Sequence, residues 1–188
     1  MNAVLPSQQT GLVAREARRV PGFTAIELLV VVVIVAVLAT LALPSFNTVV
    51  SRYRVRTAVE DLTATIYLAR SEAIRRGGGV VLRKVTVPGC TAPEPRDWNC
   101  GWLVFVDRNG NGTFDKDDEL LQSTPAPRGV DVRQTADESF MRLNRWGDLG
   151  WFGTTIGPVG SDDVARKTVL CMSGGGRLRV LPGVECPR

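Results

Sequence analysis

Histidine is absent from this 188-residue sequence, which removes the imidazole group of most catalytic triads and of many metal sites. No pair of cysteines has the C-x-x-C spacing of zinc or redox motifs. The net charge is only +4, and about half of it comes from three arginines against one glutamate in the first 22 residues. So small a net charge does not by itself imply nucleic-acid binding. The composition therefore argues against an enzyme, and any nucleic-acid site must rest on local clustering of charge.

The four cysteines form two pairs that are local in the sequence, Cys90 with Cys100 and Cys171 with Cys186. We predict one disulfide within each pair, which requires an oxidising compartment such as the bacterial periplasm. Four cysteines allow three complete connectivities, and four reduced thiols in a cytosolic protein are a further alternative.

One long apolar segment precedes the rest of the chain. Residues 28–43 carry no charge, and the run from Phe23 to Leu43 is 21 residues long. As a helix it would extend about 30 Å, the thickness of a bilayer core. The basic residues before it favour a cytoplasmic amino terminus. We therefore predict a single transmembrane helix at 23–43 in the bacterial inner membrane, with the carboxy-terminal bulk in the periplasm.

Glu27 is the exception in this segment, because a carboxylate in the bilayer costs about 2.5–3.5 kcal/mol unless it is paired. Together with Gly22 and Phe23, it makes the stretch PGFTAIELLVVVV resemble the class III signal of type IV prepilins and pseudopilins. The resemblance implies a leader peptide at 1–22 that a prepilin peptidase removes after Gly22. It also implies N-methylation of Phe23 and pairing of Glu27 with the terminal amine of a neighbouring subunit. A Sec signal peptide and an ordinary single-span anchor are the alternatives, and both leave Glu27 unexplained.

Residues 44–76 are predicted to continue the same helix in amphipathic form. Apolar side chains recur there at alternating spacings of four and three residues, with charged residues on the other faces. These apolar residues are Val55, Val59, Leu62, Ile66, Ala69 and Ala73. Pro44 is expected to kink or loosen the helix without ending it, and the glycines at 77–79 are expected to end it. We predict that this stripe packs on the chain's own head, although a short coiled coil has the same spacing.

Residues 77–188 are predicted to form one β-rich head. Strands are expected at 80–82, 85–87, 102–106, 168–172 and 178–181. One antiparallel sheet packed on the amphipathic helix gives an α+β fold, the arrangement that type IV pilins share. The stretch DWNCGWLVFVDRNGNGTFDKDDELL resembles the corresponding hairpin of the GspH/FimT family of minor pseudopilins.

That hairpin carries oxygen-bearing side chains at spacings close to those of a calcium loop, namely Asp107, Asn109, Asn111, Asp115 and Asp118. Asp118 is shorter than the glutamate usual at the twelfth position, and a strand precedes the loop where calcium loops have a helix. We therefore favour a tight turn built from Asx and glycine residues, with no cofactor, and keep calcium as the alternative.

Near the carboxy terminus, two arginines follow a glycine turn in the stretch Gly176-Arg177-Leu178-Arg179. Strand alternation would place Arg177 and Arg179 on one face, about 7 Å apart at their roots. Guanidinium groups so placed suit backbone phosphates, which they bind bidentately. The basic residues Arg166, Lys167 and Arg188 in the same segment are expected to extend the patch.

The same four residues match the GRxR motif of FimT-like minor pilins. The resemblance implies binding of extracellular DNA through phosphates, without sequence specificity, for uptake in natural transformation. Trp146, Trp151 and Phe152 are candidates for stacking on bases, although aromatic residues in so small a domain more often belong to the core. The alternatives are two solvated arginines on an edge strand, and a structural or priming role like that of GspH in a type II secretion pseudopilus.

Overall fold

The computed structural model describes residues 22–90, 92–183 and 185–186, without the side chains of residues 41–45. The chain forms two compact units, Met1–Leu43 and Pro44–Arg188. Most of the predicted leader (1–21) and Arg188 lie outside the described residues. In chain order the elements are α1 (Ala25–Arg76), β1 (Val80–Lys84), β2 (Gly101–Val106), β3 (Glu119–Pro125), β4 (Val130–Gln134), β5 (Phe140–Leu143), β6 (Phe152–Pro158), η1 (Val164–Arg166), β7 (Thr168–Met172) and β8 (Leu178–Pro182).

The first unit contains the amino-terminal part of α1, whose apolar side chains from Ile26 to Leu38 are exposed. Within the described residues, no helix has both the length and the apolar character needed to cross a membrane. The last residues of the predicted segment 23–43 belong to the group whose side chains are outside the described part.

The carboxy-terminal part of α1 behaves as its sequence pattern predicts. Pro44 does not end the helix, which continues to Arg76. All six residues of the apolar stripe are buried in the core of the head, so the stripe packs on its own head and not in a coiled coil. Gly77 has a φ of 79°, and the Gly78 amide donates to the Ala73 carbonyl at 2.8 Å. This bond and the left-handed glycine form a Schellman motif, which confirms the predicted end of the helix.

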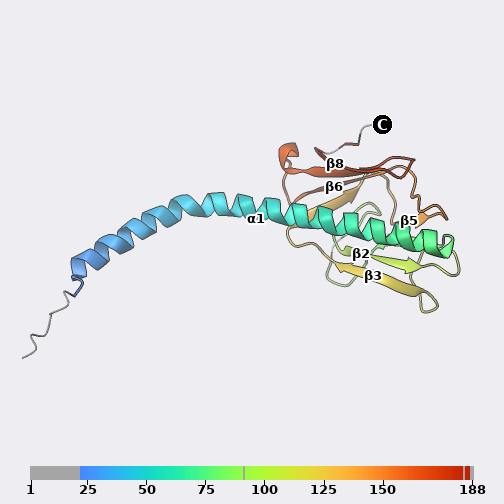
Figure 1. The fold of residues 1–188 in the computed structure, drawn as a ribbon. Coiled ribbons are helices and arrows are strands. Elements are labelled where there is room, and N and C mark those ends of the chain that lie inside the picture. Colours follow the sequence, from blue (N-terminus) through green and yellow to red (C-terminus); the bar gives the residue numbers. More distant parts are fainter. Residues whose placement is uncertain (1–21, 91, 184, 187–188) are drawn as a thin grey trace, which may run out of the picture. The chain divides into compact units, whose positions relative to one another are not determined.

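A long helix packed on antiparallel strands confirms the predicted α+β fold, but the strands form two sheets where the sequence analysis described one (Figure 1). Sheet A has the order β3-β2-β1-β5, and sheet B has the order β4-β6-β7-β8. The strands predicted from the sequence correspond to β1, β2, β7 and β8. The strands β3, β4, β5 and β6 were not predicted. β6 escapes a propensity-based prediction because it contains Gly153 and Gly157. A Cβ at Gly153 would lie 2.7 Å from the Cys186 Sγ, and one at Gly157 would lie 2.7 Å from the Lys167 Cγ. The close approach of Cys186 and Lys167 therefore requires glycine at these two positions of β6, although glycine disfavours strands.

The first predicted strand pair also needs correction. Residues 80–84 form one strand, and residues 85–87 are not a strand. Arg83 and Lys84 lie between the two predicted strands. In the structure the Arg83 guanidinium lies over the Phe140 ring, 5.8 Å from its centroid, and the Lys84 Nζ donates to the Ala92 and Glu94 carbonyls. Pro88 and the turn at Cys90, whose amide donates to the Val87 carbonyl, then end the extended region.

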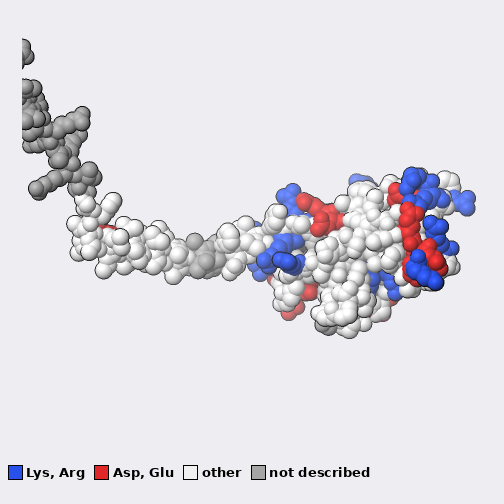
Figure 2. Space-filling view, turned by 90° about the horizontal axis from the view of Figure 1, so that it is seen from below, with Lys and Arg blue, Asp and Glu red and all other residues white. Residues whose placement is uncertain are grey.

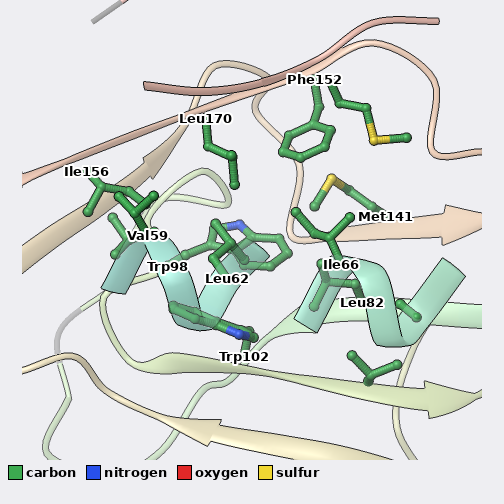
Figure 3. Packing of buried hydrophobic residues seen from close by; sticks show 14 of the residues in the cluster. Val59, Leu62, Ile66, Leu82, Trp98, Trp102, Met141, Phe152, Ile156 and Leu170 are labelled. Atoms are coloured by element: carbon green, nitrogen blue, oxygen red, sulfur yellow. The ribbon is translucent and has the colours of Figure 1, made fainter. Parts of the chain in front are cut away.

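The core lies between α1 and the two sheets. Figure 3 shows Leu62 and Ile66 of α1 between Leu170 and Phe152 of sheet B on one side and Leu82 of sheet A on the other. Two fully buried tryptophans have hydrogen-bonded indoles: Trp102 Nε1 donates to the Thr65 Oγ1 at 3.1 Å, and Trp98 Nε1 donates to the Glu138 carbonyl at 3.2 Å. Because every residue of this core comes from the second unit, the head has a complete core of its own.

Candidate functional site

The two arginines of the carboxy-terminal motif lie on a hairpin at the edge of sheet B. β8 is the edge strand, and it pairs with β7 in a register that places Arg179 opposite Cys171 and Leu178 opposite Met172. Arg177 precedes β8 and closes the turn, because its carbonyl accepts from the Ser173 amide at 3.1 Å and its amide donates to the Ser173 Oγ at 3.3 Å. Both arginine side chains are exposed, and within the described residues neither forms an ion pair.

The turn that carries Arg177 is attached to α1 through Arg70, a residue that the sequence analysis did not single out. The Arg70 Nη1 donates a hydrogen bond to the Gly176 carbonyl. Gly176 is buried and has a φ of 75°. A Cβ at this position would lie 2.6 Å from the Arg70 Nη2. The glycine of the motif is therefore required both by its backbone conformation and by the close approach of an α1 side chain.

Replacing Gly176 by Ala should destabilise the protein by about 1–3 kcal/mol, because the new side chain is strained at positive φ and displaces Arg70. Gly174→Ala in the same turn is the matched control. Gly174 has no neighbour within 4 Å of a built Cβ and no positive φ, so its replacement should cost nothing. Urea denaturation of both variants measures the difference. Equal midpoints would contradict a special role for Gly176.

Both predicted disulfides are present. Cys171 is bonded to Cys186, with their Cα atoms 5.6 Å apart, and Cys90 is bonded to Cys100, with 5.7 Å between Cα atoms. The first bond ties the segment after β8 back onto β7 at Cys171, the residue opposite Arg179. The second closes the loop before β2. Together with Arg70, the Cys171–Cys186 bond fixes the hairpin that presents the arginines.

The other basic residues predicted for this patch are not grouped with Arg177. Arg166 lies in η1 and Lys167 directly follows it, at the opposite end of β7 from the turn. They line a groove of about 450 Å³ with Arg52 and Arg56 of α1 and with Val180 of β8. The five residues of β8 lie between Arg177 and this groove, a length of roughly 16 Å along the strand. Arg188, the third of these residues, lies outside the described part of the chain.

Basic side chains also occur on another face of the head. Figure 2 shows Lys and Arg gathered at both ends of the head in that view, with acidic side chains among them. At the end where α1 finishes, Arg76 bonds to Glu119 at 2.7 Å and to Glu72 at 2.8 Å. The hydrogen bond from Arg76 lowers the pKa of Glu119. Arg76 is therefore neutralised locally, whereas Arg177 and Arg179 form no ion pair among the described residues.

The aromatic candidates separate into two groups. Phe152 belongs to the core, as aromatic residues in a small domain usually do. Trp146 and Trp151, in contrast, are 76% and 43% exposed.

The loop for which calcium was kept as an alternative is closed by its own hydrogen bonds. The buried Asp107 carboxylate accepts from the Gly110 and Gly112 amides at 2.8 and 2.9 Å and from the Arg142 Nη2 at 2.8 Å. Asn109 and Asn111 both donate to Asp115, and Asp118 accepts from the Arg108 and Asp115 amides. Within the described residues, no group of three or more acidic or cysteine side chains is placed to hold a metal ion. The oxygens that a cation would need instead stabilise an Asx-rich turn.

The residues of the predicted processing site lie at the start of α1. Gly22 and Phe23 are exposed and precede the helix. The Thr24 amide and Oγ1 both donate to the Glu27 Oε2 at 2.9 Å, and the Glu27 amide donates to the Thr24 Oγ1 at 3.3 Å. This is a capping box, and the T-x-x-E pattern of residues 24–27 is its signature in the sequence. Glu27 therefore has a role inside its own subunit, at the start of the helix.

Comparison with known proteins agrees with this architecture. Residues 58–178 match the family described as "Type II transport protein GspH". A curated relative, "Pilin-like protein PilA1" of Thermus thermophilus, is 36% identical over 99 residues, which are 53% of this chain and 56% of that protein. The match therefore spans little more than half the length of that relative.

Among solved structures, the type IV minor pilin FimU of Pseudomonas aeruginosa (strain PAO1) is similar in two crystal forms. The first has a TM-score of 0.56 at 20% identity and covers 73% of this chain and 95% of that one. The second has a TM-score of 0.53 at 19% identity and covers 71% and 97%. At this identity the likeness concerns the fold, which is the type IV pilin-like α+β fold. With its family match across 58–178, this chain belongs to the GspH family of minor type IV pilins and pseudopilins.

Proposed function

We propose that this protein is a minor pilin whose head binds extracellular DNA through Arg177 and Arg179 for uptake in natural transformation. The observation that carries the proposal is a rigid edge hairpin with two exposed arginines that lack ion-pair partners among the described residues. Free guanidinium groups bind phosphate oxygens bidentately, and an edge strand lets a polyanion approach without obstruction. Recognition of phosphates alone would be independent of base sequence.

The processing and assembly roles of the amino-terminal residues belong to the same proposal. A prepilin peptidase would cleave between Gly22 and Phe23, an exposed linkage outside regular structure. The released Phe23 amine, after methylation, would then be available to Glu27 of a neighbouring subunit. Before assembly the protein would be anchored in the inner membrane by the apolar part of α1, with the head in the periplasm, where both disulfides are stable.

Titration of the full chain in detergent micelles with DNA at two salt concentrations tests the DNA proposal. The double variant Arg177→Ala/Arg179→Ala should lose affinity by about tenfold per arginine at low salt. The slope of log affinity against log salt should become shallower by about two, because two phosphate contacts no longer release counterions.

The matched control is Lys116→Ala/Arg128→Ala, which removes the same charge from two exposed residues outside the hairpin. Its DNA affinity should stay within about twofold of wild type, since non-specific attraction at a distance is screened. Equal losses in both double variants would show that only net charge matters. Undetectable binding by the wild type at low salt would instead favour the alternative, in which this GspH-family chain has a structural or priming role without DNA binding.

A further inference from the structure

Two exposed tryptophans lie close to the arginine hairpin, and neither belongs to the core cluster of the head. Of the four tryptophans in the chain, Trp98 and Trp102 are fully buried, whereas Trp146 and Trp151 are 76% and 43% exposed. Tryptophan is enriched among the residues that contribute most of the binding energy at interfaces.

The register of sheet B, extended by one residue, brings Trp151 and Arg177 into the same row. Phe152 pairs with Met172, and Met172 pairs with Leu178, so these three residues form one row across β6, β7 and β8. Phe152 and Met172 face the core. Trp151 directly precedes β6, and the Ser173 amide donates to the Arg177 carbonyl between β7 and β8. Extending the register of sheet B by one residue places Trp151, Ser173 and Arg177 in a further row, with side chains on the opposite face because directions alternate along a strand. Across two strand spacings, Trp151 and Arg177 are roughly 10 Å apart at the backbone.

Trp146 reaches the same place through α1. A Cβ at Gly147 would lie 3.1 Å from the Arg70 carbonyl and 3.1 Å from the Ile74 side chain. The Arg70 guanidinium holds Gly176 in the arginine turn. The loop of Trp146 and the turn of Arg177 therefore flank the same turn of α1, and Figure 1 shows both at the end of the head where this helix finishes.

The loop that carries the tryptophans is ordered by its own hydrogen bonds. The Asn144 Oδ1 accepts from the Trp146 and Asp148 amides at 2.8 and 3.0 Å, and the Asp148 Oδ1 accepts from the Gly150 amide at 2.9 Å. Leu149 packs against the core cluster. The two indoles are thus presented from a fixed backbone, which lowers the entropy lost when a ligand binds.

We infer that this surface, comprising Trp146, Trp151, Arg177 and Arg179, binds single-stranded DNA, with bases stacked on the indoles and phosphates held by the arginines. Aromatic faces beside a basic groove are the features by which proteins bind single strands without sequence preference. The bases of a duplex are already stacked on each other and offer these indoles no free face. The inference rests on the proposed DNA binding and adds a preference for unpaired bases.

The test uses the full chain in detergent micelles and two probes, an oligo(dT) of about 12 nucleotides and a duplex of the same length. Trp146→Ala/Trp151→Ala should weaken binding of the oligo(dT) by about tenfold per tryptophan. Binding of the duplex should change by less than about twofold, and the salt slope should stay the same because no charge is removed. Oligo(dT) should also quench the tryptophan fluorescence of the wild type but not that of the double variant, whose remaining tryptophans are buried.

Tyr53→Ala is the matched control, because Tyr53 is 69% exposed and lies near the other end of the head part of α1. Its affinity for both probes should equal that of wild type. Trp151 is half-buried, so Trp151→Leu serves as a second variant that keeps apolar packing without an aromatic face. It should lose oligo(dT) affinity as Trp151→Ala does, and Trp151→Phe should recover part of it.

The inference is overturned if the tryptophan variants bind oligo(dT) as the wild type does. The proposed function survives that result as long as Arg177→Ala/Arg179→Ala still weakens binding of both probes. Conversely, loss of oligo(dT) binding in the tryptophan variants with no effect of the arginine variant would support the stacking surface and reject the phosphate role.

Discussion

Glu27→Ala in the full-length chain is expected to abolish incorporation into filaments while cleavage after Gly22 continues. A carboxylate inside an apolar helix costs about 2.5–3.5 kcal/mol at the centre of a bilayer unless it is paired. A chain retaining that group needs a partner for it, and the amine exposed by cleavage is the partner we propose. The measurement is the amount of the variant in purified filaments compared with the amount in the membrane fraction.

The structure shows how to separate this role from helix capping. Glu27 accepts two hydrogen bonds from Thr24 in a capping box, a motif in which glutamine serves almost as well as glutamate. Glu27→Gln therefore retains the cap and removes the charge. We expect it to fail in assembly as Glu27→Ala does. Normal filament incorporation of the glutamine variant would show that Glu27 acts through the start of the helix, and pairing with a neighbouring amine would have to be abandoned.

Removal of the Cys171–Cys186 bond is expected to lower both stability and DNA affinity. The two cysteines are 15 residues apart, so the double variant Cys171→Ser/Cys186→Ser should lose about 3 kcal/mol, mainly because the unfolded chain is no longer constrained. DNA affinity should fall by about threefold to tenfold at a temperature where the variant is folded, since Arg177 and Arg179 are then less fixed before binding. Urea denaturation and DNA titration measure the two effects.

The other disulfide provides the control. Cys90 and Cys100 are 10 residues apart, so Cys90→Ser/Cys100→Ser should lose a similar free energy of unfolding, also about 3 kcal/mol. This bond closes the loop before β2 in sheet A, away from the hairpin. Its removal should leave DNA affinity unchanged. A fall in DNA affinity that tracks stability equally in both variants would mean that the Cys171–Cys186 bond has no specific role in presenting the arginines.

Those parts of the molecule that depend on neighbours along the chain were predictable from the sequence. The apolar stripe of α1 was correct residue by residue, because its spacing follows directly from the helical period. The end of the helix at the glycines was correct because only glycine adopts the left-handed cap without strain. The disulfide partners were correct because each pair is local in the sequence. The capping box of Thr24 and Glu27 was equally predictable, since it is a four-residue pattern.

The tertiary structure alone decided how distant segments meet. The second sheet contains β6, in which Gly153 and Gly157 leave room for the close approach of Cys186 and Lys167. Because glycine disfavours strands, local propensity does not predict β6. Arg70 secures the arginine turn over a separation of 106 residues, which no local pattern encodes. The sequence by itself determined the helix, the residues that resemble a prepilin processing signal and the presence of two arginines after a glycine. Only the packing of α1 against sheet B decided that the two arginines are exposed and that Arg166 and Lys167 line a groove with α1 instead. The same packing left Trp146 and Trp151 exposed, because burial depends on which surfaces come together.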